Sequence, residues 1–409
     1  MQLSPLYETD HPRNPNYEKD IVYVMKYTKW ILNPIGIWPA VLKGVGKFLP
    51  TIAIGFNNLA LLFIVIQCVL HITLEQKDPL LRLKFLGLTC FISISLMKYY
   101  ALTKQKSNIE YCIKQVQSDW KQVELQKDRK LMLKYGKISR CLTMCSVVLI
   151  YSGGLMYISI LQYTIGSYVD ENNRTIKLLA YPTYNDLYDV RRSPIYEITY
   201  AFQCVCGYVF DTIAAGSCGL AALFITHACG QIDIIISRLN DLVVGKFSKH
   251  DSNANVRMTE IVKHHIRILR FSQMVGTILQ EVCFLEFVGS TFVICLLEYF
   301  CIADWKQKNS IGVISYLVLL TSLMFNLFIL CYTGNLLLDK SSNIGVLCFM
   351  IEWYSLPTKT IQSLVLVIAM SNSPLKITAG RIVDMSLLTF GNIMKTSFAY
   401  LNFIQTTIM

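Results

Sequence analysis

Clusters of cysteine, histidine and glycine are the places where metal or enzymatic chemistry would first be expected, and in this chain they are incomplete. Cys204-x-Cys206 and Cys141-x-x-x-Cys145 lack the second pair of ligands that a tetrahedral zinc site needs, and His264-His265 has no further ligand at helical spacing. Gly44-Val45-Gly46-Lys47 lacks the first glycine of a phosphate-binding loop and the Ser or Thr after its lysine. Neither Gly-x-Ser-x-Gly nor His-Glu-x-x-His occurs. The sequence therefore predicts no metal, no cofactor and no catalysis.

One acidic residue stands inside an apolar run. Asp211 interrupts residues 198–232, which are otherwise apolar enough to cross a membrane. An ionisable group at that depth costs about 2.5–3.5 kcal/mol on insertion scales, so it needs a partner or water. We expect its carboxyl to hydrogen bond Thr212, Ser217 or a neighbouring helix. Contact with a ligand hydroxyl and a part in gating are the alternatives.

The last apolar run, residues 385–409, is interrupted by polar side chains more often than any other. Polar residues that cannot face lipid cheaply face protein or water instead. The pattern predicts a helix that lines water or one held by interhelical hydrogen bonds. The polar residues are Thr389, Asn392, Lys395, Thr396, Ser397, Asn402, Gln405, Thr406 and Thr407.

The composition favours a membrane as the solvent for these residues. Of the 409 residues 53% are hydrophobic and 16% are charged, and the mean hydropathy is +0.43. The fourteen cysteines lie mostly in apolar runs, which is typical of buried free thiols. Because a membrane crossing needs about 20 apolar residues, seven transmembrane helices are predicted. Their residues are 48–74, 80–97, 141–169, 198–232, 282–303, 309–338 and 385–409.

The basic residues predict the orientation. The net charge is +11, and 28 of the 38 lysines and arginines fall in the N-terminal segment and in the second, fourth and sixth connections. Such an excess marks cytosolic segments rather than a nucleic-acid partner. The N-terminus is therefore expected in the cytosol, without a cleaved leader, and the C-terminus outside. The acceptor sequence Asn173-Arg174-Thr175 falls on the predicted outer side.

Four regions follow from these assignments. Residues 1–47 form a cytosolic N-terminal segment, and residues 48–338 form the first six transmembrane helices with their loops. Residues 339–384 form a cytosolic segment with an apolar helix that ends near Pro374. Residues 385–409 form the final helix. Glu281 and Glu286 are assigned to a cytosolic extension of the fifth helix.

Short motifs in the C-terminal third carry a family resemblance. The chain lacks Asp-Arg-Tyr and Asn-Pro-x-x-Tyr in the places typical of G-protein-coupled receptors, and its predicted orientation is the reverse of theirs. It instead resembles the insect odorant-receptor family. The motifs are Cys331-Tyr332-x-Gly334, Ser341-Ser342, Trp353, Leu356-Pro357, Leu375-x-x-Thr378-Ala379-Gly380, Ser397-Phe398-Ala399-Tyr400-Leu401 and, earlier, His227-Ala228-Cys229-Gly230-Gln231.

Two departures refine this resemblance. Gustatory relatives tend to end in Thr-Tyr, five apolar residues and Gln-Phe, whereas Ala399 precedes Tyr400 here and no Phe follows Gln405. The family's shared co-receptor has an expanded loop between its fourth and fifth spans, whereas residues 233–270 are short. The chain is similar to a variable, ligand-tuning subunit.

The resemblance implies a function and a location. The expected activity is binding of a volatile, mostly apolar small molecule within the membrane and opening of a non-selective cation channel. The expected partners are the odorant co-receptor, in a heterotetramer, and membrane lipid, and the expected site is the plasma membrane of an olfactory neuron's dendrite. A seven-helix receptor that signals through a second messenger, and a gustatory-type channel, are the alternatives.

The resemblance also implies positions for the working residues. A ligand pocket is expected in the outer halves of the second, third, fourth and sixth spans, with plain helix packing as the alternative. The final helix would line the pore, and the cytosolic parts would anchor the subunits. The expected pocket residues are Phe85, Leu88, Met156, Tyr157, Phe202, Cys206 and Tyr316, those of the pore are Phe403, Thr406 and Thr407, and those of the subunit contact are Trp353 and Tyr354.

Overall fold

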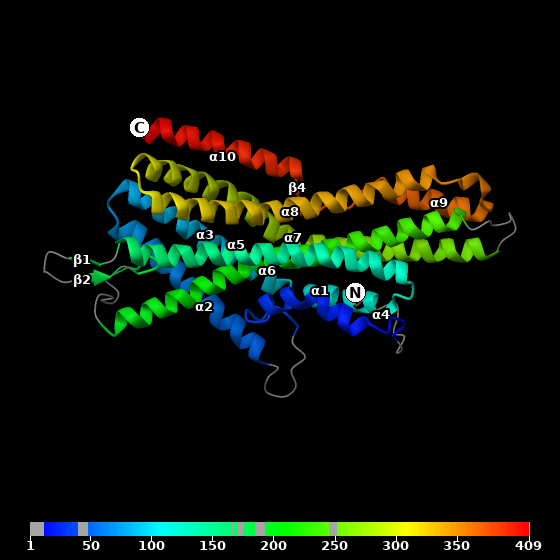
Figure 1. Ribbon diagram of the computed structural model, residues 1–409, viewed down its shortest axis with the longest axis horizontal. Coiled ribbons are helices and arrows are strands. Elements are labelled where there is room, and N and C mark those ends of the chain that lie inside the picture. Colours follow the sequence, from blue (N-terminus) through cyan, green and yellow to red (C-terminus); the bar gives the residue numbers. More distant parts are fainter. Residues whose placement is uncertain are drawn as a thin grey trace.

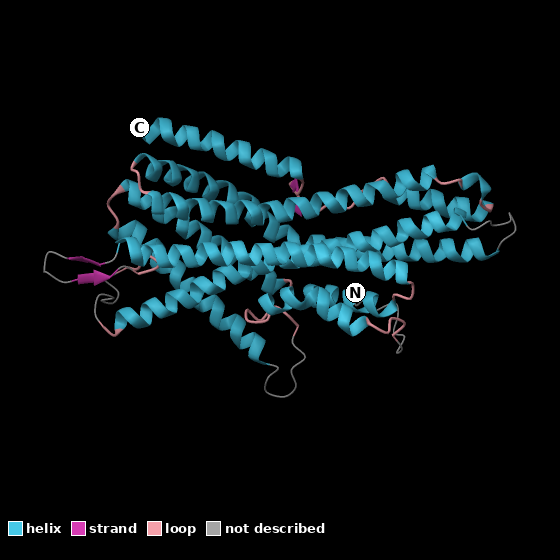
Figure 2. Cartoon of the chain, viewed as in Figure 1, coloured by secondary structure: helices cyan, strands magenta, loops and turns pink. Residues whose placement is uncertain are grey.

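A computed structural model shows a protein built almost entirely of helices, with two very short hairpins (Figure 2). It describes residues 12–39, 48–165, 167–169, 175–177, 179–184, 193–244 and 252–408. Side chains are not described at 159–165, in β1 and β2, or at 243–244, 252–253, 404–405 and 407–408. The sequon residues Asn173 and Arg174 lie outside the described part.

The elements follow one another as a series of helices. The first are α1 (Tyr17–Leu32), α2 (Leu49–Leu70), the π-turn η2 (His71–Glu75), α3 (Pro79–Lys104), α4 (Lys106–Gln122) and α5 (Gln126–Ile165). The hairpin β1 (Ser167–Val169) and β2 (Thr175–Lys177) precedes α6 (Ile195–Val244), α7 (Ser252–Lys306) and α8 (Ser310–Met350). Last come η3 (Trp353–Ser355), α9 (Thr358–Ser371), the hairpin β3 (Thr378–Ala379) and β4 (Val383–Asp384), and α10 (Leu387–Ile408).

The longest helices lie along the long axis of the molecule. Helices α5, α6, α7 and α8 run from the end that carries β1 and β2 towards the end that carries α9 (Figure 1). Helix α10 lies along one edge, and the C-terminus is near the same end as the β1–β2 hairpin (Figure 1). The two ends of the molecule are therefore distinct, one formed by short loops and the hairpin and the other by helical extensions.

Within the described residues, six helices are long and apolar enough to cross a membrane. They include α2, α3, α5, α6, α7 and α8. The first six predicted runs coincide with these helices except at one end: the run 141–169 reaches too far, since α5 ends at Ile165 and residues 167–169 form β1. Helices α5 through α8 also extend well beyond the runs at their other ends, because polar residues continue the helices outside the apolar core. Helix α10 is not among the six, since Asn392, Lys395 and Asn402 lower its hydropathy. Of the seven predicted transmembrane helices, six are thus supported by the length and hydropathy of the described helices.

Helix α6 is the centre of the packing. It contacts α1, α2, α3, α4, α5, α7 and α8, and 89% of its most apolar stretch is buried, against 22% in α3 and in α5. Small residues allow this crowding. A Cβ at Gly216 would lie 2.8 Å from Leu32 Cδ2 of α1, and one at Gly219 would lie 3.0 Å from Thr143 Cγ2 of α5. Close approach of backbones is a common way to gain van der Waals contact between membrane helices.

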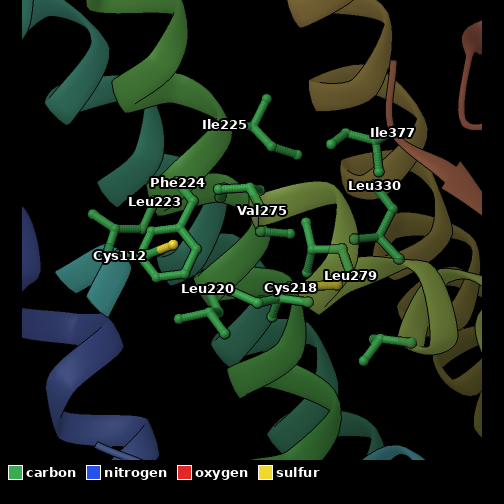
Figure 3. Packing of buried hydrophobic residues seen from close by; sticks show 14 of the residues in the cluster. Cys112, Cys218, Leu220, Leu223, Phe224, Ile225, Val275, Leu279, Leu330 and Ile377 are labelled. Carbon is green, nitrogen blue, oxygen red and sulfur yellow. The ribbon is translucent and has the colours of Figure 1, made fainter. Parts of the chain in front are cut away.

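The core continues from α6 towards α7 and α8. Phe224 of α6 meets Phe271 of α7 edge to face, with ring centroids 6.0 Å apart. Figure 3 shows Cys112 beside Leu223 and Phe224 on one side of this core and Leu330 beside Ile377 on the other, with Val275 between the two groups. The thiols in this core are free, as the composition predicted for the described cysteines.

The break before the last helix is a tight hairpin. Strands β3 and β4 pair in antiparallel register, and Gly380 and Arg381 at the turn have φ angles of 59° and 64°. Ala379 pairs with Val383, so three residues form the loop, and the Ile382 N–H donates to the Ala379 carbonyl at 3.0 Å across a turn whose two central residues both have positive φ. The predicted break between an apolar helix and a final helix is therefore confirmed, with α9 ending at Ser371.

Candidate functional site

A cavity of about 900 Å³ lies in the half of the molecule that carries the β1–β2 hairpin. Its walls come from η2, α3, α5, α6, α7 and α8 and from the segment 179–183. The volume is in the range of ligand sites for small molecules, and such sites combine apolar walls with a few polar groups.

One face of α8 forms a wall of the cavity. Its lining residues recur at three- and four-residue steps, which place them on a single helical stripe. They are Gly312, Ser315, Tyr316, Leu319, Ser322, Leu323 and Asn326. Tyr316 stacks on Phe300 of α7, with ring centroids 6.1 Å apart and an interplanar angle of 26°. The stripe starts at the first turn of α8 and continues towards the middle of the molecule.

Charged groups border one end of the cavity, near η2, the start of α3 and the end of α7. His71 Nδ1 lies 2.9 Å from Glu75 Oε2 in the π-turn. Lys84 Nζ lies 5.8 Å from the Tyr316 ring centroid, a distance at which a cation is attracted to the ring face. Asp304 accepts a hydrogen bond of 3.1 Å from Asn309 Nδ2. The ionic groups at this end are thus engaged with neighbours.

The segment 179–184 closes one side of the cavity and is held by a glutamine of α6. The Tyr181 N–H donates to Gln203 Oε1 at 3.0 Å, and Gln203 Nε2 donates to the Tyr181 carbonyl at 3.1 Å and to Thr183 Oγ1 at 2.9 Å. A second glutamine, Gln67 of α2, accepts from the Tyr184 N–H at 3.1 Å. Buried backbone polar groups are nearly always hydrogen bonded, and these two glutamine amides satisfy several of those in the segment.

Two glycines make room for polar side chains at the cavity wall. A Cβ at Gly207 would lie 2.8 Å from Tyr181 Oη, and a Cβ at Gly154 would overlap Asp211 Oδ2. Burial raises the pKa of the Tyr181 phenol well above its usual range, so this hydroxyl stays protonated. The bare backbones of α5 and α6 therefore let a carboxyl and a phenol border the same space.

The predicted pocket residues divide into two groups. Phe85, Leu88, Tyr157 and Tyr316 line the cavity. Met156, Phe202 and Cys206 do not: Cys206 is buried, and Phe202 packs edge to face on Phe63, 6.1 Å between centroids. Whether the lining residues bind a ligand is a proposal, taken up below.

The expected partners of Asp211 are wrong. Thr212 Oγ1 donates to the Tyr208 carbonyl at 2.6 Å and lies 2.7 Å from Tyr151 Oη, while Ser217 Oγ donates to the Ala214 carbonyl at 2.9 Å. Hydroxyls in helices often bond the backbone one turn back, which removes them as donors for neighbours. Sequence reasoning also missed Tyr181 and Asn326; the stripe on α8 was the available signal for Asn326.

A buried ion pair lies next to the cavity. Lys98 of α3 pairs with Glu286 of α7, and Glu286 Oε1 also accepts from Ser290 Oγ at 2.8 Å and from Asn326 Nδ2 at 3.3 Å. Asn326 lines the cavity, so the pair is one residue away from it. The assignment of Glu286 to a cytosolic extension stays a prediction, and the structure shows that its carboxyl is buried between α3, α7 and α8. Glu281 does pair with Lys104 at an exposed position, 2.9 Å.

Helix α10 packs by a single face. Ile393, Ser397 and Leu401 are buried at four-residue intervals, and Ser397 Oγ lies 3.5 Å from the Thr291 carbonyl of α7. Phe403 is 67% exposed, and Thr406 is also exposed. The Thr407 side chain lies outside the described part. Within the described residues, one face of α10 thus lacks cover from the rest of the chain.

Comparison with known proteins agrees with this architecture. The family model described as "7tm Odorant receptor" matches residues 81–398. Curated relatives include "Odorant receptor 10" of Aedes albopictus, 25% identical over 53% of this chain and 57% of the relative, and "Odorant receptor 13a" of Drosophila melanogaster, 24% identical over 54% and 55%. The matched region thus spans little more than half of each relative.

Solved structures show the same fold. The insect olfactory receptor OR5 of Machilis hrabei in complex with eugenol superposes with a TM-score of 0.80 at 15% identity, covering 96% of this chain and all of that one. The structure of OR5 described without that ligand gives 0.73 at 16% identity over 94% and 99%.

The chain belongs to the insect odorant receptor family and is a multi-pass membrane protein of that family. Members of this family are receptor channels of olfaction rather than enzymes, which confirms the prediction made from the missing catalytic motifs.

Proposed function

We propose that the cavity binds a small, volatile, mostly apolar odorant and that binding opens a non-selective cation channel. The observation that carries the proposal is a cavity of about 900 Å³ walled by five transmembrane helices and closed by the clamped segment 179–184. Phe85, Leu88, Tyr157 and Tyr316 would supply much of its apolar contact. Three of the predicted pocket residues lie outside the lining, and they would affect the shape of the cavity only through the residues that they contact. They are Met156, Phe202 and Cys206.

The proposed topology has seven spans, a cytosolic N-terminus and an extracellular C-terminus. It is supported by the 28 basic residues on one side and by the position of the C-terminus near the β1–β2 hairpin (Figure 1). Helix α10 would be the seventh span, as its 22 residues are long enough to cross at 1.5 Å each. The cavity then opens in the outer half of the membrane. Antibody tags test this topology: in intact cells only a C-terminal tag should be accessible.

The proposed ion path runs along the uncovered face of α10. Exposed Phe403 would form an apolar constriction, and Thr406 and Thr407 would give the path polar lining. Four copies around one axis would cover this face with the α10 helices of their neighbours. Lys395 is exposed on the same helix nearer its N-terminus, which the topology places towards the cytosol.

The proposed subunit contact lies at the opposite end of the molecule. Trp353 and Tyr354 are exposed there with Phe349 and Met350, and the two rings of η3 meet edge to face 6.1 Å apart. Such a group of large apolar side chains is typical of an interface core. The proposed partner is the odorant co-receptor, with this chain as the tuning subunit, because only residues 245–251 connect α6 and α7.

Co-expression in a cell without insect receptors tests the function. We expect odorant-evoked cation current in the plasma membrane when the chain is expressed with the co-receptor, and no requirement for a G protein. An odorant panel should include eugenol, which is bound in the structure of the Machilis relative. A current that disappears when G-protein signalling is blocked would instead favour the second-messenger alternative, and no response to any odorant would contradict the proposal.

A further inference from the structure

The Asp211 carboxyl borders the cavity without an internal partner. Among the described residues, no hydrogen bond or ion pair engages it, although it lines the cavity from α6. The other acids along the lining are engaged: Glu75 by His71 and Asp304 by Asn309. Among the three acidic side chains that line this cavity, Asp211 is thus the one whose oxygens accept no hydrogen bond from a described residue.

The position of this carboxyl depends on the opposite helix. It lies against the bare backbone of Gly154 on α5, where a Cβ would overlap Oδ2. The neighbouring residue, Gly153, is different: a Cβ there would be 3.4 Å from Leu319 Cδ2, an ordinary contact. Of these two glycines, only Gly154 therefore leaves space that the Asp211 carboxyl occupies and that a methyl group would take.

The Thr212, Ser217 and Tyr157 hydroxyls near Asp211 are already engaged, whereas the Tyr181 hydroxyl, which borders the same space, is not hydrogen bonded to this carboxyl in the described part of the chain. The Thr212 and Ser217 hydroxyls bond backbone carbonyls, and the Tyr157 hydroxyl donates to the Ala180 carbonyl at 3.3 Å. A buried carboxyl that lacks a donor is unfavourable, so a ligand that brings one gains more here than it would in water.

We propose that Asp211 accepts a hydrogen bond from the ligand, so that the cavity selects small apolar molecules carrying one O–H or N–H donor. This inference rests on the proposed odorant-binding function. Aliphatic and aromatic side chains around the carboxyl, among them Ile150, Ala214 and Tyr157, suit an apolar ligand body. Ethers and esters of the same shape bring no donor, so they would leave the acceptor oxygen of the carboxyl unpaired. A site built around a hydrogen bond rejects such analogues strongly for this reason.

Matched ligands provide the test. Concentration–response curves of the channel formed with the co-receptor should be measured for 2-phenylethanol, benzyl methyl ether and 2-phenylethylamine, and for hexanol, methyl pentyl ether and hexylamine. We expect the better donor of at least one skeleton to act at about ten- to a hundredfold lower concentration than its ether, because the ether leaves a shielded acceptor without its hydrogen bond. A stronger amine identifies an ammonium partner, and a stronger alcohol identifies a hydroxyl donor.

Variants separate recognition from packing. Asp211→Leu should reduce the donor-to-ether ratio to about one, because the acceptor is gone. Asp211→Asn keeps a carbonyl acceptor, so it should retain the alcohol preference and lose any amine preference. A purely structural role would change the responses to donor and ether alike and leave their ratio as it was.

Two control positions complete the design. Gly154→Ala should lower the ratio by displacing the carboxyl, whereas Gly153→Ala should preserve it. Glu298→Gln removes another buried acid, whose Oε2 has no partner in the described part and which lies outside the cavity lining, and it should also preserve the ratio. Surface expression is measured for each variant.

The outcomes are distinct from those of the proposed function. Odorant-evoked current without any donor preference, or a preference that survives Asp211→Leu, overturns the role of Asp211 and leaves odorant binding intact. Responses to the ethers alone overturn it as well. The absence of current with every odorant overturns the proposed function itself.

Discussion

His227 Nε2 of α6 lies 3.0 Å from Asp119 Oδ2 of α4, in the half of the molecule away from the cavity. Arg267 of α7 pairs with the other oxygen of the same carboxyl at 3.3 Å, and Gln115 Nε2 donates to it at 3.2 Å. One buried carboxylate thus joins three helices, and α4 is held to α6 and α7 by charge as well as by apolar packing.

Loss of this carboxylate should destabilise the protein in a pH-dependent way. Burial raises the pKa of Asp119, but Arg267 and His227 lower it by more, so the pKa lies below its ordinary value of 3.8. A lowered pKa contributes stability that is present above pH 3.8 and is lost as the pH falls towards the folded-state value. We expect Asp119→Asn to cost about 3 kcal/mol at pH 7, in line with breaking a buried pair.

Thermal unfolding in detergent at a series of pH values measures both effects. The difference in stability between the native protein and Asp119→Asn should shrink as the pH falls below 3.8. Glu124→Gln is the matched control, since its pair with Arg13 is exposed and 3.3 Å long. A constant difference across the pH range would show that the charge of Asp119 is not what stabilises the contact.

The ion pair of Lys98 and Glu286 should behave as a unit. Lys98→Met leaves a carboxylate buried without its cation and should cost about 3–5 kcal/mol. Adding Glu286→Leu should restore part of that stability, because both charges are then absent. Lys104→Met, which breaks the exposed neighbouring pair with Glu281, should cost less than about 1 kcal/mol. A double variant whose loss equals the sum of the losses in Lys98→Met and Glu286→Leu alone would rule out coupling between the two residues.

The clamp on segment 179–184 should control the cavity. Gln203→Leu removes the acceptor for the Tyr181 N–H and two donors, and should cost about 1–3 kcal/mol. Hydrogen exchange at Tyr181 and Thr183 should become faster, and odorants should be needed at higher concentration. Gln122→Leu on α4, whose amide reaches Ser118 Oγ at 3.5 Å, is the control. Unchanged exchange would mean that apolar packing alone holds the segment.

Phe403 should contribute to channel closure. It lies on the uncovered face of α10, and an apolar ring excludes water from a narrow path. Phe403→Ser should raise the resting current without odorant, partially in a mixed tetramer because other subunits keep their own constriction. Cysteine at this position should react with reagents added from outside during odorant application. If resting current, permeability and reactivity all stay the same, Phe403 has a packing role.

Trp353 should matter for assembly. Its ring is 41% exposed at the end of the molecule that carries α9, beside Phe349 at 73%. Trp353→Ala should weaken co-purification with the co-receptor, with a loss of about 2 kcal/mol if it is a central interface residue. Trp305→Ala, at an exposed tryptophan on the other end of the molecule, should leave it unchanged. Normal assembly of Trp353→Ala would remove this residue from the interface.

The helices were predictable from the sequence because each needs only a local apolar run. Their extensions were predicted only in part. Glu281 was assigned to an extension of the fifth helix, but the polar residues that lengthen α6 beyond residues 198–232 and carry α7 back to Ser252 read as loop. The cavity was partly predictable: Tyr316 was identified, although the stripe to Asn326 on the same helix was not. The stripe is visible in the spacing, but only packing shows which face of α8 is turned inwards.

The cavity wall at Tyr181 was beyond sequence reasoning. Its clamp joins Gln203 to a residue 22 positions earlier, and Gln67 reaches Tyr184 over 117 positions. Asp211 was recognised as unusual from its sequence context, yet its lack of a partner follows from the local bonds of Thr212 and Ser217. The hydropathy pattern identifies a charged residue within an apolar run, but its hydrogen-bond partners can be determined only from the three-dimensional structure.

The burial of the most apolar stretch of α6 has a consequence for how the protein would meet its lipid. Exposed apolar side chains such as Leu59 and Phe56 of α2 and Leu155 of α5 would contact hydrocarbon in a bilayer, whereas 89% of that stretch of α6 is buried. A change in bilayer thickness acts on helices that span the hydrocarbon and face it. It would therefore tilt or strain α2, α3 and α5 before the buried part of α6, so that membrane thickness would alter the width of the cavity mainly from its outer walls.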